Sequence, residues 1–242
     1  MGTKVVTRDS NPTEVLPSVH SAIVSCTRCA RLRRYCERVA TEKKPAHRHE
    51  SYWGRPVPGF GDPAARLLVV GLAPAAHGAN RTGRVFTGDG SGDFLMRALH
   101  EAGFANQPTS RAADDGLRLL DAYIAAAVRC APPDNKPTPR EIAACAPHLV
   151  AEFRALRRVR VIVALGRIGF DACLSLLAAH GASVRPRPAF GHNVAHGFGP
   201  GLPSVVASYH PSRQNTNTGK LTPQMLLDVF LEARRAIESP SR

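Results

Sequence analysis

Four short apolar runs alternate with more polar stretches along the chain. They consist mainly of β-branched and small residues and lie at residues 66–71, 122–129, 160–166 and 204–209. Hydrophobic residues fill these runs almost without interruption, whereas a strand with one face in water would alternate apolar and polar positions. The pattern therefore predicts four strands that are covered on both faces.

Stretches with a helical pattern fall between and after these runs, at residues 92–102, 139–157, 168–180 and 223–237. Two of them have a recognisable start. Thr138 is followed by Pro139 and Glu141, which is the spacing of a capping box with proline in the first turn. Thr222 and Pro223 repeat the cap and the proline. We expect helices to begin at both positions.

Strands that alternate with helices predict an α/β fold of three layers, in which a central, mainly parallel four-stranded sheet lies between helices. A chain of 242 residues fits one domain. We expect this domain to span residues 21–240 after a flexible tail of residues 1–20, with a long surface loop at residues 37–62. Ligands of such folds bind beyond the carboxyl ends of the strands, so the following loops are the places to look for chemistry.

The chain is strongly basic. Lysine and arginine number 32 against 19 acidic residues, giving a formal net charge of +13 and a pI near 10.3. This charge favours a polyanionic partner, although a soluble basic protein from a GC-rich genome would have a similar composition. No apolar run approaches the roughly 20 residues of a membrane helix, and the first residues lack the apolar core of a signal peptide. We expect a monomer in the cytoplasm.

Four of the six cysteines form two pairs. Cys26 and Cys29 make a C-x-x-C motif at the end of a predicted first helix, and Cys130 and Cys145 bracket a proline-rich loop. In a reducing compartment such thiols more often bind metal than form disulfides. A zinc site usually repeats the close C-x-x-C spacing, which the second pair lacks. A [4Fe-4S] cluster accepts scattered thiolates, so it is the first choice and zinc the second.

The remaining two cysteines are Cys36 and Cys173. Cys36 follows the first pair closely and could replace one ligand, which leaves the set of four open. Cys173 stands in an apolar helical stretch. We expect it in the core, where free cysteine is often buried.

A glycine-rich segment, residues 71–95, leads from the first strand to the next helix. Either something polar approaches its backbone closely or it is a turn without a ligand. Gly78 and Gly83 have the spacing of a phosphate-binding P-loop, but Arg84 and Val85 stand where that motif needs lysine and serine or threonine. The G-x-G turn of dinucleotide-binding proteins is also missing. A metal-bound nucleotide is therefore not supported.

Residues 71–89, the four paired cysteines and the segment SYHPSRQNTNTGKLT at residues 208–222 together resemble the uracil-DNA glycosylase superfamily. The similarity is greatest to its type 5 branch of iron-sulfur enzymes and extends from Cys26 to Leu221. The resemblance implies an enzyme that flips a damaged base out of DNA and hydrolyses its glycosidic bond, leaving an abasic site. Uracil is the first expected substrate, and other deaminated bases such as hypoxanthine are further candidates.

The resemblance assigns the first active-site motif to residues 71–75, where Ala73 and Pro74 would border the flipped base. Other branches place Asp, Glu or Asn near the start of this motif to orient water, whereas here the motif is apolar. Asp89, at the end of the same loop, is the nearest carboxylate and the candidate for this catalytic role. Its alternative role is to cap the helix that begins near residue 92.

Three further side chains are implied in base recognition or catalysis. Phe86 matches the position whose ring stacks on the extruded base. Asn135 would read the base edge with its amide, although asparagine in a proline-rich segment is often only a turn residue. His210 follows the last strand and would donate a hydrogen bond to the departing base, on which negative charge develops.

The segment after His210 is expected to contact DNA. Its candidate DNA-binding residues are Ser212, Arg213, Gln214, Asn215 and Lys220. They fit a loop that enters the minor groove, where Gln214 or Asn215 could fill the space that a flipped base leaves.

Two other functions are compatible with parts of this pattern. A non-catalytic, metal-bearing DNA-binding module could keep the same scaffold, but it has no need for Asp89, Asn135 and His210 together. A metabolic enzyme with a small substrate would not require a net charge of +13. A DNA glycosylase accounts for more of these features than either alternative.

Overall fold

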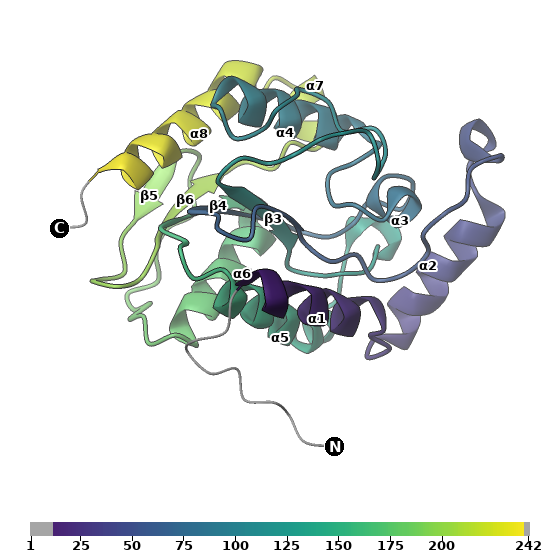
Figure 1. Cartoon of the computed structure of the whole chain (residues 1–242), viewed down its shortest axis with the longest axis horizontal. Helices are drawn as coiled ribbons and strands as arrows, with labels where there is room; N and C mark the ends of the chain where they lie inside the picture. The colour runs from purple at the N-terminus through teal and green to yellow at the C-terminus, as the bar shows by residue number, and fades with distance from the viewer. Residues whose placement is uncertain (1–11, 240–242) are drawn as a thin grey trace.

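The computed structural model describes residues 12–239 of the 242-residue chain. A sheet of six strands runs through its centre in the order β1-β3-β2-β4-β6-β5 (Figure 1). The four inner strands are parallel: β3 (Ala122–Ala126), β2 (Leu67–Gly71), β4 (Val161–Leu165) and β6 (Ser204–Ser208). The edge strands, β1 (Phe60–Gly61) and β5 (Val194–His196), are antiparallel to their neighbours.

The prediction of a four-stranded sheet is therefore wrong in the number of strands, while its parallel centre is confirmed. The sheet is mixed because each edge carries a short antiparallel strand. β1 has two residues, and Val194 and Ala195 of β5 are exposed, so neither strand produces an apolar run in the sequence. Short or exposed edges of this kind are common because a long apolar edge would pair with other chains.

Helices cover both faces of the sheet (Figure 1). One face is covered by α4 (Gly90–Glu101) and α8 (Pro223–Glu238). The other face is covered by α1 (Pro12–Val24), α5 (Pro139–Ala155) and α6 (Gly166–Ala178). At one end of the molecule, α2 (Ala30–Glu42) contacts the short α3 (Ala79–Thr82). The smaller elements are η1 (Pro45–His47), η2 (Pro133–Asn135) and α7 (Arg213–Asn217).

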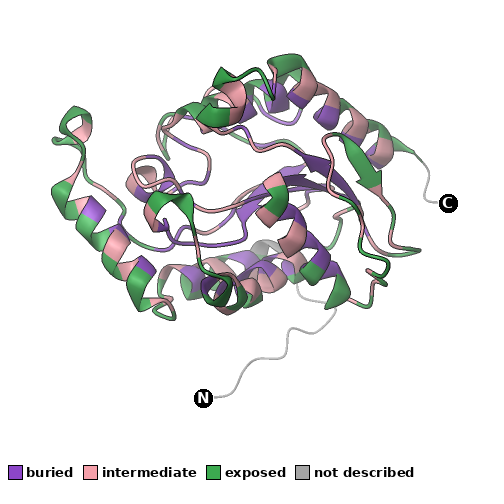
Figure 2. Cartoon of the chain, turned by 180° about the vertical axis from the view of Figure 1, so that it is seen from behind, coloured by how far each residue is buried: buried purple, intermediate pink, exposed green. Residues whose placement is uncertain are grey.

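The inner strands are buried because successive side chains enter two different cores. Leu67 and Val69 of β2 pack into the core beneath α4 and α8, and Leu68 and Val70 pack into the core above α5 and α6. All four side chains are 0% exposed. Figure 2 shows the sheet as the most buried layer of the molecule. Burial on both faces explains why these strands appear in the sequence as continuous apolar runs.

Both predicted helix starts are confirmed. Thr138 Oγ1 accepts a hydrogen bond from Glu141 N at 3.2 Å, and the Glu141 carboxylate accepts one from Thr138 N at 2.8 Å, which completes the capping box of α5. Thr222 Oγ1 accepts from Met225 N at 3.2 Å at the start of α8. Local capping chemistry therefore determined where these two helices begin.

The beginning of the described chain is more regular than expected. Part of the predicted tail, residues 1–11, lies outside the described residues, but the chain is helical from Pro12 onward and α1 packs against α5. The segment predicted as a long surface loop, residues 37–62, includes the last turns of α2, η1 and β1. Within residues 12–239, no helix is both long and apolar enough to cross a membrane.

Candidate active site

Loops that carry the candidate residues meet at the carboxyl ends of the inner strands. β2, β3 and β6 run in the same direction, so the loops that follow them leave the sheet at the same edge. The chain after β2 is tied to the chain after β3, because Ala127 N donates to Gly71 O at 2.9 Å. The loop after β6 joins them through His210, whose ring centroid is 5.9 Å from that of Phe86.

Phe86 has an unusual backbone conformation, with a φ of 49°. A phenylalanine seldom adopts a positive φ, so the surrounding loop must impose it. Its half-buried ring lies against Gly71, where a Cβ atom would come within 2.7 Å of ring atom Cε2. The ring is inclined by 31° to that of His210. A glycine at position 71 thus lets this aromatic ring pack directly on the end of β2.

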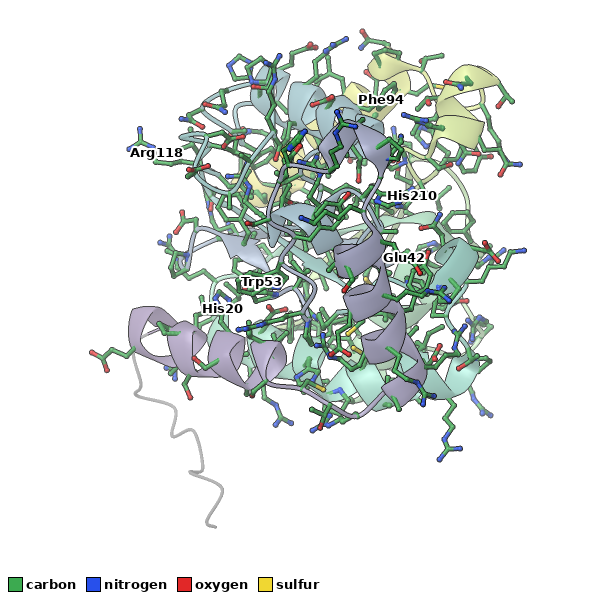
Figure 3. The ribbon with its side chains drawn as sticks, turned by 90° about the vertical axis from the view of Figure 1, so that its right-hand side faces the viewer. His20, Glu42, Trp53, Phe94, Arg118 and His210 are labelled. Atoms are coloured by element: carbon green, nitrogen blue, oxygen red, sulfur yellow. The ribbon has the colours of Figure 1, made fainter. Side chains whose placement is uncertain are left out.

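His210 lies within the body of the protein, whereas the exposed Arg118 extends into solvent (Figure 3). Burial lowers the pKa of His210 to about 4. The imidazole is therefore neutral at pH 7 and retains one N–H donor. Its backbone is fixed, because the carbonyl oxygen accepts hydrogen bonds from Ser212 N and from Asn215 Nδ2, both at 2.8 Å.

Asp89 caps α4 and faces the glycine-rich loop at the same time. Its Oδ1 accepts a hydrogen bond from Gly92 N at 2.9 Å, so the helix-cap interpretation is confirmed. Its Oδ2 lies on the other side, against Gly78, where a Cβ atom would come within 2.0 Å of it. Burial raises the pKa of this carboxyl, and backbone N–H groups and Arg213 act in the opposite direction. One oxygen is committed to the helix and the other is not.

Asn135 does not join this group through a hydrogen bond. It is exposed in η2 with a φ of 57°, and within residues 12–239 its side chain makes no hydrogen bond. Of the two predicted base-bordering residues, Pro74 is buried, and Ala73 packs against the cluster that contains Cys130 and Cys145. The first motif therefore lies between the Phe86 loop and the cysteine region.

The predicted DNA-binding segment forms the turn into α7. Ser212 Oγ accepts a hydrogen bond from Asn215 N at 3.4 Å and caps this helix. Arg213, Gln214 and Lys220 are exposed, whereas Asn215 is half-buried and its amide is engaged with the preceding turn. Of the two residues considered as wedges, Gln214 is the one whose side chain is free to extend.

A buried arginine that sequence reasoning did not assign to the site holds the loop around Phe86. Arg84 is 5% exposed, and its Nη2 donates to both carboxylate oxygens of Asp115 at 2.8 and 2.9 Å. Its Nε donates to Thr87 Oγ1 at 2.9 Å. Burial alone would raise the pKa of Asp115, but hydrogen bonds from Arg84 and from backbone N–H groups lower it. The partners are 31 residues apart, so no local sequence pattern identifies the pair.

The four paired cysteines line one recess. They come from the turn before α2, the chain after β3 and the second turn of α5: Cys26, Cys29, Cys130 and Cys145. Burial raises the pKa of Cys145 to about 11. No three His, Cys, Asp or Glu side chains within residues 12–239 are arranged to hold a single metal ion.

The other two cysteines lie outside this recess. Cys36 is buried on α2, and its Sγ donates to the carbonyl oxygen of Ala131 at 3.7 Å. Cys173 is 0% exposed within α6, which confirms its prediction as a core residue. Neither thiol lines the recess.

The protein has a three-layer α/β fold. Its candidate site places an aromatic ring, an imidazole and a carboxylate at the carboxyl ends of the parallel strands, beside four converging cysteines. The chain belongs to the uracil DNA glycosylase superfamily, because the model of that family, described as "Uracil DNA glycosylase superfamily", matches residues 58–234. The match includes the Phe86 loop, both strands that precede the other candidate residues, and the segment after His210.

Its similarity to individual proteins places the chain in the type-5 branch. It is 54% identical over 213 residues to the type-5 uracil-DNA glycosylase of Thermus thermophilus, covering 88% of this chain and 94% of that protein. It is 52% identical over 217 residues to the type-5 enzyme of Mycobacterium tuberculosis, covering 89% and 80%. It is 48% identical over 214 residues to that of Pyrobaculum aerophilum, covering 87% and 88%.

Proposed function

We propose that this protein is a DNA-repair glycosylase that excises uracil from DNA by hydrolysis of the N-glycosidic bond. Membership of the type-5 branch supports this activity. The observation that carries it is the pairing of Phe86 with a half-buried, neutral His210 at a centroid distance of 5.9 Å. An aromatic face and a fixed N–H donor, side by side, suit a planar base that has been flipped out of the duplex.

His210 acts on the departing base. As the bond between base and sugar breaks, negative charge develops on the base and positive charge on the sugar. The neutral imidazole donates its N–H to a base oxygen and stabilises this anion. Its backbone is held by Ser212 and Asn215, so the donor is fixed before the reaction begins.

Asp89 acts at the sugar. Gly92 N fixes Oδ1, and this leaves Oδ2 to stabilise the cationic sugar or to accept a proton from the attacking water. The cap and the catalytic role are therefore compatible, because each uses a different oxygen. The apolar first motif contributes backbone and shape, with no carboxylate of its own.

Hypoxanthine is the second substrate that we propose. Ala73 and Pro74, which border the base in this scheme, have small side chains without hydrogen-bonding groups. A purine would meet neither a bulky side chain nor an unpaired polar group there. Asn135 is exposed and its side chain has no hydrogen-bond partner among the described residues, so its amide is available to read the edge of the incoming base.

The four converging cysteines fit an iron-sulfur cluster better than a single zinc ion. They line one recess, and Cys130 and Cys145 lack the second close C-x-x-C spacing that a zinc site usually has. A [4Fe-4S] cluster is larger and would be held by Cys26, Cys29, Cys130 and Cys145. When bound, it would serve as a structural crosslink that fixes the loop between Cys130 and Cys145, on which Asn135 lies.

Oligonucleotides with one uracil or one hypoxanthine test the activity, in single-stranded and double-stranded form. Abasic products are converted to strand breaks by alkali, and DNA with thymine or adenine at the same position is the control. We expect breaks only at the lesion. His210→Ala should lower the single-turnover rate on uracil by roughly 100 to 1,000-fold while binding to abasic DNA persists. Binding of lesion DNA without any abasic product would instead favour a non-catalytic DNA-binding module.

A further inference from the structure

Arg129 is a buried charge beside the cysteine recess, and part of it has no partner. The residue is 1% exposed, and its Nη2 donates to the Glu152 carboxylate. Its Nε and Nη1 are buried and make no hydrogen bond within residues 12–239. Buried N–H groups are nearly always paired, and those of a charged guanidinium are especially costly to leave unpaired. Something outside the described protein atoms is therefore expected to accept these hydrogen bonds.

The position of Arg129 indicates what the acceptor is. The residue precedes Cys130 directly, lines the cysteine recess, and donates its backbone N–H to Cys145 Sγ at 3.2 Å. A cluster held by four thiolates would place a net negative charge in this recess. Sulfur atoms of such clusters accept hydrogen bonds, and these bonds and nearby charges set the reduction potential.

Glu152 holds the guanidinium and accepts two further hydrogen bonds from other parts of the protein. This 0% exposed carboxylate accepts hydrogen bonds from Gly59 N at 2.7 Å and from the Tyr123 hydroxyl at 3.1 Å, in addition to Arg129. His20 Nε2 lies 2.7 Å from the same hydroxyl. The acid thus belongs to a satisfied network on the side away from the cysteines, and it positions Arg129 without neutralising its other donors.

We propose that Arg129 directs the N–H groups of its two unpartnered nitrogens, Nε and Nη1, to the sulfur atoms of the cluster and balances the negative charge of the cluster. This inference rests on the proposed iron-sulfur cluster. Arginine suits the position because it stays charged when buried and presents several donors in a rigid plane. Arg28 lines the same recess, but it is exposed and donates to Ala144 O, so solvent screens its charge. Arg129 is a positioning residue for the cluster, distinct from its cysteine ligands.

Four variants of the full-length chain, purified without oxygen, test this role: Arg129→Met, Arg129→Lys, Glu152→Gln and Arg28→Met. Iron and sulfide content, the reduction potential and the rate of iron release to a chelator are measured for each. Arg129→Met should lower the reduction potential, because loss of a positive charge makes adding an electron harder. It should also release iron roughly 10 to 100-fold faster. Arg28→Met removes the same charge at an exposed site and should stay close to the wild type.

Glu152→Gln separates electrostatics from structural damage. It removes a negative charge while keeping an oxygen that can accept from Gly59 and Tyr123, so the potential should rise. Arg129→Lys keeps the charge but loses the fork of donors, so it should release iron faster with a smaller change in potential. These two variants carry the test if Arg129→Met does not accumulate as folded protein. Opposite shifts for the two changes of charge support the proposal.

Three results would overturn the inference in distinguishable ways. If the wild type holds a cluster and the Arg129 and Glu152 variants match its potential and iron-release rate, Arg129 does not contact the cluster while the proposed function stands. An equal fall of the reduction potential in Arg129→Met and Glu152→Gln would also overturn the inference. These variants change the local charge in opposite senses, so only general structural damage would lower the potential in both. A colourless wild type without iron would remove the cluster and this inference together.

Discussion

Arg84 and Arg129 are both buried and both paired with a carboxylate, but only one of them is satisfied by the protein. Every side-chain nitrogen of Arg84 donates a hydrogen bond, one within the Phe86 loop and the others to the segment between α4 and β3: Nε to Thr87, Nη1 to Ala113, and Nη2 to Ser110 and Asp115. Arg129 bonds through Nη2 alone, and its other two nitrogens have no partner among the described residues.

The comparison shows two ways in which a buried charge can serve a site. Around Phe86 the network is closed, so the protein alone can hold the strained φ of 49° and keep the ring beside His210. At the cysteines the network is open toward the recess, which indicates that this region is completed by a bound group. The conformation of the Phe86 loop should therefore depend on its own residues, and that of the cysteine region on the proposed cluster.

Breaking the closed network should have the largest effect. Arg84→Met leaves the half-buried Asp115 carboxylate without its cation. Loss of one partner of a fully buried ion pair costs about 3–5 kcal/mol of the free energy of unfolding, so this is the upper bound expected here. Arg187→Met is the matched control, because its pair with Asp171 is exposed and is expected to contribute about 0–1 kcal/mol. Denaturant unfolding measures both. Equal values for the two variants would show that the Arg84 network does not anchor the loop.

Asp89→Asn tests the carboxylate at the end of the Phe86 loop. Asparagine is an equally good helix cap, so the melting temperature should not fall. The single-turnover rate on uracil DNA should drop by roughly 100 to 10,000-fold if Oδ2 acts as a base. Wild-type rate in this variant would reduce Asp89 to a helix cap.

The pH dependence follows from the same carboxyl. Burial raises the pKa of Asp89 in the folded protein, so its carboxylate becomes protonated at a higher pH than that of an ordinary aspartate. The rate of the wild type should therefore decline as the pH falls through this raised value. The pKa of His210 is lowered to about 4, so its protonation does not account for a decline that begins above that value. The residual rate of Asp89→Asn should not decline in this way at acidic pH. If the decline persists in this variant, it arises from the titration of another group.

Gly78→Ala should disturb the same carboxylate. A Cβ atom at Gly78 would lie 2.0 Å from Asp89 Oδ2. The backbone at this position has φ −100° and ψ −105°, which lies outside the main regions for alanine, so backbone strain adds to the steric contact. Displacement of a catalytic group by about 1 Å can cost on the order of 100-fold in rate. Gly197→Ala is the control, because its Cβ atom would meet nothing within 4 Å. Similar rates for both variants would show that Oδ2 can move without consequence.

The smallest effect is expected at the exposed positive charges of the segment after β6. Lys220→Ala should weaken DNA binding and reduce the slope of log affinity against log salt concentration by about 1, because one phosphate contact is lost. Arg158→Ala is the control, since this exposed arginine precedes β4 at the amino-terminal ends of the parallel strands, away from the candidate site. An unchanged slope in Lys220→Ala would place this segment away from the DNA backbone.

Sequence patterns predicted the centre of the fold and the chemical types at the site. The four inner strands and the helices that begin after Thr138 and Thr222 follow from local signals, namely continuous apolar runs and caps. The edge strands β1 and β5 were missed because they are short or exposed. Asp89 illustrates the limit of such reasoning, since sequence offered a cap or a catalytic group; the structure confirms the cap, and the catalytic role stays a prediction.

By itself, the sequence determined which residues are buried in strands, where two helices begin and which thiols could converge, because these depend on neighbouring positions in the chain. Only the tertiary structure decided that Arg84 meets Asp115, that Arg129 meets Glu152 with two donors to spare, and that the Phe86 ring stands 5.9 Å from that of His210. These partners lie on different segments, and a buried charge finds its partner through packing of the whole chain, which no local pattern encodes.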